Sequence, residues 1–124
     1  MRSMSVKPPY SGKIGYTRKE FGAIFQIYSQ NVYTGLFKDF SFIDMNGKYY
    51  ISFREEAGKT PLITIEKRSL GGDRVLFVAT SPGANNQLME IARSEKIESF
   101  VNQLKAKIET IRTSRTSAGV KSLR

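Results

Sequence analysis

The chain has 124 residues, a length that suits a single domain, and a hydrophobic content of 40%, which is enough to build a core. It contains no cysteine and no histidine, which excludes disulfides, thiol nucleophiles and cysteine-based zinc sites and removes the commonest general base. The net charge is +9, and no run approaches the roughly 20 apolar residues that span a bilayer.

The first residues predict a flexible basic arm. Residues 1–13 contain Pro8-Pro9 and Ser11-Gly12, which disfavour regular structure. This stretch has positive charges but no apolar segment of the kind found in signal peptides, so we expect a cytoplasmic protein that does not enter membranes.

A helix is predicted over residues 18–34. Thr17 and Glu20 have capping-box spacing, in which a hydroxyl and a carboxylate three residues apart each bind a free backbone amide. Gly35 is placed to end the helix in a left-handed conformation. An apolar stripe recurs at helical spacing: Phe21, Ile24, Phe25, Tyr28 and Val32.

The period of the apolar residues then changes from 3.6, which is typical of a helix, to 2, which predicts strands. Residues 37–43 are aromatic-rich, Asn46-Gly47 is a strong hairpin signal, and residues 48–54 alternate cleanly. In the alternating strand Tyr49, Ile51 and Phe53 point to one face. The residues that point to the other face are Lys48, Tyr50, Ser52 and Arg54.

Further strands are predicted over residues 62–67 and 74–80, with a turn at Gly71-Gly72-Asp73 between them. Residues 87–92 fit either a short fifth strand or a helix, and their position after a turn favours the strand.

A second helix is predicted over residues 95–112. Ser94 is a good N-cap, and Glu95 in the first turn complements the helix dipole. An apolar stripe follows: Ile97, Phe100, Val101, Leu104, Ile108 and Ile111. Residues 113–124 are rich in Ser, Thr, Lys and Arg and predict a flexible basic tail.

The element order predicts an α+β domain over residues 14–112, between a basic arm (1–13) and a basic tail (113–124). It consists of an N-terminal helix, an antiparallel meander of four or five strands, and a C-terminal helix, because short connections exclude the long crossovers of parallel strands. Both helices carry one apolar stripe, so we expect them on one sheet face, with the other face open or used for binding.

From residue 14 to about residue 108 the chain resembles a family of short alphaproteobacterial proteins with a domain of unknown function. The resemblance lies in Tyr16-Thr17-Arg18-Lys19-Glu20, in Ile24 and Tyr28, in Gly35-Leu36-Phe37-Lys38-Asp39-Phe40, in Phe53-Arg54, and in Pro61-Leu62-Ile63-Thr64-Ile65-Glu66-Lys67. That family often has Trp at the position of Phe37 and an Arg pair at Arg54-Glu55. The resemblance implies a small cytoplasmic bacterial protein without an assigned activity.

The charge is distributed unevenly along the chain. Residues 1–19 hold five basic residues and no acidic one, and residues 112–124 hold four and none, so the two ends account for the whole net charge of +9. The eleven basic residues between them match eleven acidic residues. A surplus confined to the ends indicates a polyanionic partner.

Nucleic acid is the partner that these residues favour, as single strands or without sequence preference. Lys48, Tyr50 and Arg54 share one strand face and combine cations with an aromatic ring, as single-strand binders do. The remaining candidates are a cluster near the third turn and the two ends: Lys67, Arg68 and Arg74; Lys7 and Lys13; Arg115, Lys121 and Arg124. The alternative is a protein–protein module or homodimer whose basic ends serve solubility.

Other chemistry is poorly supported. Without His or Cys there is no obvious activated nucleophile, so we expect no enzyme and no cofactor. The Gly-containing loops match no phosphate-binding fingerprint, and the run of oxygen ligands that a hard cation requires is missing.

Overall fold

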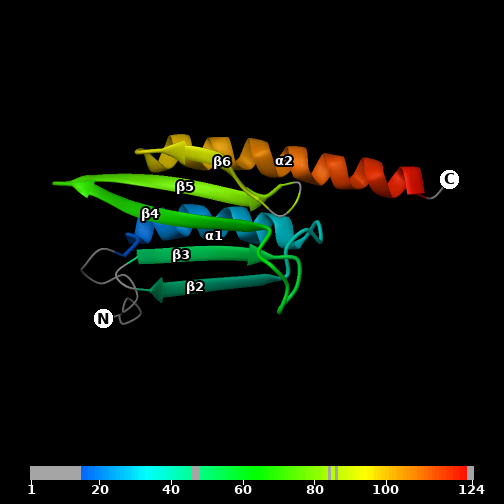
Figure 1. Ribbon diagram of the computed structural model, residues 1–124, viewed down its shortest axis with the longest axis horizontal. Coiled ribbons are helices and arrows are strands. Elements are labelled where there is room, and N and C mark those ends of the chain that lie inside the picture. The colour runs from blue at the N-terminus through cyan, green and yellow to red at the C-terminus, as the bar shows by residue number, and fades with distance from the viewer. Residues whose placement is uncertain (1–14, 46–47, 84, 86, 123–124) are drawn as a thin grey trace.

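The structure is a computed structural model that describes residues 15–45, 48–83, 85 and 87–122, without the side chains of residues 45 and 115–122. Two helices enclose a run of five strands in the chain (Figure 1). In order, the elements are α1 (Arg18–Val32), β2 (Asp39–Met45), β3 (Lys48–Arg54), β4 (Ile63–Gly71), β5 (Arg74–Pro82), β6 (Leu88–Ser94) and α2 (Ile97–Ser122). The predicted α+β class and element order are confirmed.

Helix α1 begins at the predicted capping box. The Thr17 hydroxyl accepts from the Glu20 amide at 3.1 Å, and the Glu20 carboxylate accepts from the Thr17 amide at 2.9 Å. Gly35 has φ +81°, the left-handed conformation expected just after the helix. The helix ends at Val32, two residues before its predicted end.

The five strands form one antiparallel sheet in the order β2-β3-β4-β5-β6, so each strand pairs with its neighbour in sequence. This confirms the meander and the strand interpretation of residues 87–92. β3 has its predicted bounds, whereas β4 and β5 continue beyond theirs to Gly71 and Pro82. The predicted Asn46-Gly47 turn lies outside the described residues.

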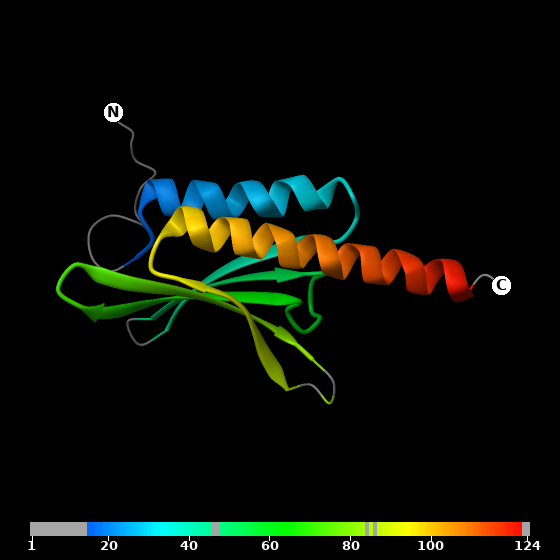
Figure 2. The same cartoon turned by 90° about the horizontal axis from the view of Figure 1, so that it is seen from above.

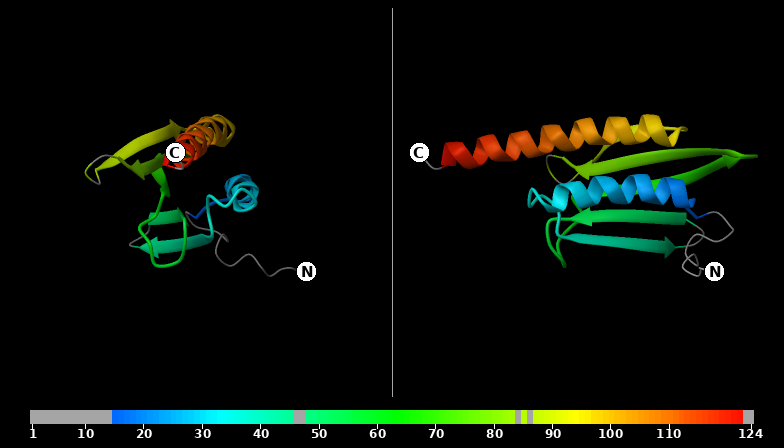
Figure 3. Two further views of the ribbon diagram at one scale, coloured as in Figure 1. Left: turned by 90° about the vertical axis from the view of Figure 1, so that its right-hand side faces the viewer. Right: turned by 180° about the vertical axis from the view of Figure 1, so that it is seen from behind.

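Both helices cover the same face of the sheet (Figures 2 and 3). Phe53 on that face packs against Tyr28 and Phe37, with ring centroids 5.4 and 4.9 Å away. Phe77 packs against Phe100 of α2 at 5.6 Å. The predicted facing of β3 is confirmed, because Ile51 and Phe53 are fully buried while Lys48 is exposed.

Helix α2 corrects the predicted boundary at residue 112. It continues to Ser122, so residues 113–122, which were predicted to be part of a flexible tail, are helical. Figure 2 shows its last turns extending past the sheet. The apolar stripe ends at Ile111, and the position seven residues after Ile108 is Arg115. The final turns therefore carry charge where the earlier turns carry core residues.

Candidate nucleic-acid interface

The open face of the sheet is the surface predicted to meet nucleic acid. The register places Tyr50 of β3 between Ile43 of β2 and Glu66 of β4, and it places Arg54 opposite Asp39. Because directly paired residues share a face, these side chains all lie on the side away from the helices. The face therefore combines cationic and aromatic groups with two carboxylates.

Arg54 donates hydrogen bonds to three neighbouring groups. Its guanidinium donates to the Ser41 hydroxyl at 2.8 Å and to the Asp39 carboxylate at 3.3 Å, while its Nε donates to the Lys59 carbonyl at 2.9 Å. The Arg54 and Asp39 side chains are 19% and 31% exposed. A phosphate would have to displace Asp39 to reach this guanidinium.

Two further cations of this face are also paired, whereas Lys48 is not. Arg68 meets Glu66 at 3.2 Å, and Arg93 meets Glu90 at 2.9 Å. A hydrogen bond and charge from Glu90 raise the pKa of Arg93 above its ordinary value. Lys48 is exposed and takes part in none of the ion pairs between described residues. It is the cation of the predicted face that is best placed for a phosphate.

Arg74, at the start of β5, is paired with Glu95, which directly follows the end of β6. Two hydrogen bonds of 2.7 and 3.1 Å join the guanidinium to both carboxylate oxygens. The hydrogen bond that Arg74 donates lowers the pKa of the Glu95 carboxyl, and the same hydrogen bond raises the pKa of the Arg74 guanidinium. The Arg74 guanidinium thus has a carboxylate partner of its own.

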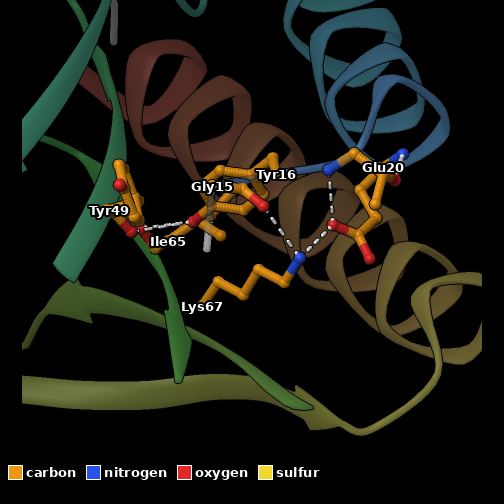
Figure 4. Close-up of polar contacts among 7 residues, drawn as sticks. Gly15, Tyr16, Glu20, Tyr49, Ile65 and Lys67 are labelled. Carbon is orange, nitrogen blue, oxygen red and sulfur yellow. Dashed lines mark hydrogen bonds and ion pairs between the residues drawn. The ribbon is translucent and has the colours of Figure 1, made fainter. Parts of the chain in front are cut away.

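Lys67 lies on the helix-covered face, contrary to its predicted place beside Arg68 and Arg74. Its Nζ donates to the Glu20 carboxylate at 2.6 Å and to the Gly15 carbonyl at 3.1 Å (Figure 4). The Lys67 and Glu20 side chains are only 9% and 14% exposed. The ammonium also sits 5.8 Å from the ring centroid of Tyr16. Lys67 therefore ties α1 to the sheet and is removed from any nucleic-acid surface.

Tyr16 belongs to the same buried group, and the sequence indicated it only as part of the family resemblance. It is fully buried, and its hydroxyl donates to the Tyr49 carbonyl at 3.0 Å (Figure 4). Burial raises the pKa of this hydroxyl far above its ordinary value, and the nearby Glu20 carboxylate raises it further. The folded chain therefore keeps the Tyr16 proton at pH values where the unfolded chain has lost it.

This shift predicts alkaline sensitivity. The contribution of Tyr16 to stability is complete below the unfolded-state pKa of about 10 and falls as the pH rises above it, because the unfolded chain then binds fewer protons. Tyr16→Phe should lower the free energy of unfolding by about 1 kcal/mol at neutral pH, because the hydrogen bond is lost. Above pH ~10 the free energy of unfolding of this variant should fall less steeply than that of the wild type. Denaturant unfolding across this pH range measures both effects. Tyr33→Phe, at a side chain that is 95% exposed, is the control and should follow the wild type.

The basic ends are only partly described. Lys7, Lys13 and Arg124 lie outside the described residues. Arg115 and Lys121 lie on the helical backbone of α2, beyond the end of its apolar stripe at Ile111. The side chain of Arg112, one turn earlier, pairs with Glu109. The described residues therefore show no terminal cation beside the open sheet face.

The described residues contain no group of three or more acidic side chains that could hold a metal ion. Neither helix among them combines the length and apolarity needed to cross a bilayer. No family model matches the chain, and no curated protein or solved structure matches it either. The resemblance to the alphaproteobacterial family therefore stays a prediction.

Proposed function

We propose that this protein is a non-enzymatic, cytoplasmic binding module that contacts nucleic acid through its basic ends, without strict sequence preference. The observation that carries the proposal is the location of the charge surplus. All of the +9 net charge comes from residues 1–19 and 112–124. Lys19 pairs with Glu98 and Arg112 with Glu109, but the two end segments contain no acidic residue of their own. Polyphosphate binding depends on such an excess of cations over carboxylates.

The ion pairs of the folded body support assigning nucleic-acid binding to the chain ends. Arg54, Arg68 and Arg93 of the open face each meet a carboxylate within 3.3 Å. These cations are already neutralised, so a phosphate gains little by approaching them. The sheet face consequently has a secondary role, in which Lys48 contacts phosphate and the half-buried Tyr50 stacks on a base.

The helical extension of α2 places much of the C-terminal positive charge on a regular helical backbone. The segment from Arg112 onward contains four basic and no acidic residues, and its backbone is helical as far as Ser122. A helix that extends past the body can approach a phosphate chain without steric conflict from the sheet. Contacts of this kind position a protein on nucleic acid but do not read its bases.

The test is a titration of a labelled single-stranded oligonucleotide at several salt concentrations. In the tail variant the four terminal cations are changed to glutamine: Arg112, Arg115, Lys121 and Arg124. We expect weaker binding and a slope of log K against log salt that is smaller by up to about 3, since each lost phosphate contact removes about 0.7 for single strands.

A matched control removes four exposed cations from the balanced middle of the chain: Lys38, Lys59, Lys96 and Lys105, each changed to glutamine. The net charge changes by the same amount, so binding that depends on total charge alone would weaken equally in both variants. Equal weakening, or no salt-dependent binding by the wild type, contradicts the proposal.

A further inference from the structure

Tyr33, in the connection that follows α1, is the most exposed large apolar side chain among the described residues. It is 95% exposed, whereas the other exposed side chains of this kind range from 36% to 68%. Its ring takes part in none of the ring contacts between described residues. Tyrosine is normally intermediate in burial, because most of its side chain is apolar. A ring exposed to this extent is accessible to a ligand.

The backbone that carries Tyr33 is fixed by hydrogen bonds and by the core. The Thr34 hydroxyl and the Leu36 amide both donate to the Asn31 carbonyl, at 3.0 and 3.1 Å. Leu36 and Phe37, which follow in the chain, are buried in the hydrophobic core. Because this connection is already ordered, a ligand that binds Tyr33 has little backbone entropy to remove, which favours affinity.

The relation between the two helices places Tyr33 beside the C-terminal basic segment, residues 112–124. Helices α1 and α2 run side by side in the same direction (Figures 1 and 2). Near their starts, the Lys19 ammonium lies 2.8 Å from the Glu98 carboxylate. Both helices rise by ~1.5 Å per residue, so residues that follow this pair by the same number of positions lie at about the same level. Fourteen positions later the two chains of residues reach Tyr33 and Arg112. The exposed ring is therefore level with the first residue of the basic segment.

An exposed ring next to a run of cations is the combination that single-strand binders use. From Arg112 to Ser122 the backbone of α2 is helical, and this stretch contains basic residues but no acidic one. In single-strand binders cations follow the phosphates, while aromatic rings stack on successive bases. Bases inside a duplex are stacked between their neighbours, so a side chain reaches the face of a base only where the strand is unpaired.

We infer that Tyr33 stacks on an unpaired base of a single-stranded nucleic acid whose phosphates lie along the C-terminal turns of α2. This inference rests on the proposed function and deepens it, because phosphate contacts alone do not distinguish a single strand from a duplex. Every base has a face on which a ring can stack, so the lack of strict sequence preference is retained. The half-buried Tyr50 of the sheet offers less of its ring, which makes Tyr33 the main stacking residue.

Three labelled polyanions test this inference with the full chain: an oligothymidine strand, the same strand with abasic sites in place of the bases, and a duplex. Tyr33→Ala should weaken binding of the oligothymidine strand by roughly fivefold or more, because it removes one stacking contact. The slope of log K against log salt should stay unchanged, since no phosphate contact is lost. Binding of the abasic strand and of the duplex should be the same as for the wild type.

Two control variants separate stacking from other effects of the substitution. Tyr33→Phe keeps the ring and should bind all three polyanions as the wild type does. Leu70→Ala removes a side chain that is 41% exposed from the β4–β5 turn, which lies near the start of α1, at the opposite end of that helix from Tyr33 (Figure 2). It should also bind like the wild type. Circular dichroism shows whether each variant is folded, which we expect because both positions are exposed.

The outcomes distinguish this inference from the proposed function. If Tyr33→Ala binds oligothymidine as tightly as the wild type, or loses as much affinity for the abasic strand as for oligothymidine, stacking by Tyr33 is wrong. Salt-dependent binding of the abasic strand by the wild type would then still support the proposed function. A wild type that binds none of the three polyanions overturns both.

Discussion

Phe53→Asp is expected to abolish folding. The Phe53 ring is fully buried and packs against Phe37, Tyr28 and Phe40 within 6 Å. A carboxylate at this position would lose its water without gaining a partner, and the aromatic contacts would be lost as well. The combined cost should exceed about 4 kcal/mol, which is a large part of the stability of a small domain.

Circular dichroism and denaturant unfolding measure this effect. Lys48→Asp is the matched control, because it places the same carboxylate on the same strand but on the open face, where the side chain is exposed. It should leave the fold intact. A folded Phe53→Asp protein with a cooperative transition would show that the assigned facing of β3 is wrong. Ile51→Asp, at the neighbouring fully buried position, should behave like Phe53→Asp.

The second large effect is expected at the Lys67–Glu20 ion pair. Lys67→Met leaves the Glu20 carboxylate in a site where its side chain is only 14% exposed. Glu20→Gln leaves the ammonium of Lys67 near the rings of Tyr16 and Phe77. Removal of one member of a buried pair should cost roughly 3 kcal/mol, because the remaining charge has lost its main partner.

The double variant Glu20→Gln with Lys67→Met separates this explanation from a simple loss of packing. Most of the lost stability should return, since neither charge is then buried alone. If the two single effects add in the double variant, the pair is not energetically coupled. The Lys19–Glu98 pair is the control: its side chains are 74% and 65% exposed, and its removal should leave stability nearly unchanged.

Much of the fold could be predicted because local signals and packing agree. The capping box at Thr17 starts α1, and the alternation of β3 matches its observed bounds. Residues 113–122 were not recognised as helical, because an apolar stripe indicates packing and this segment has none. Its helix continues the backbone hydrogen bonding of the preceding turns, which hydropathy patterns do not reveal.

Parts of the candidate site could have been predicted from the sequence by also considering strand register. A two-residue turn at Asn46-Gly47 implies the register that sets Asp39 opposite Arg54, and alternation from Ile63 and Ile65 places Lys67 on the core face. The pairing of Arg74 with Glu95, 21 residues apart, could not be read in this way. It depends on how α2 approaches the β4–β5 turn, which only the packed structure defines.

Helix α2 begins beside Lys19, where the N-terminal basic segment ends, and carries the C-terminal basic segment away from it. Lys19 near the start of α1 contacts Glu98 at 2.8 Å, near the start of α2. From Glu98 to Ser122 the helix rises about 36 Å, at ~1.5 Å per residue. That distance is close to one turn of a B-form duplex, roughly 34–36 Å. Under the proposed function, phosphates bound near Lys19 and near Ser122 would thus lie about one helical repeat apart, on the same side of a double helix.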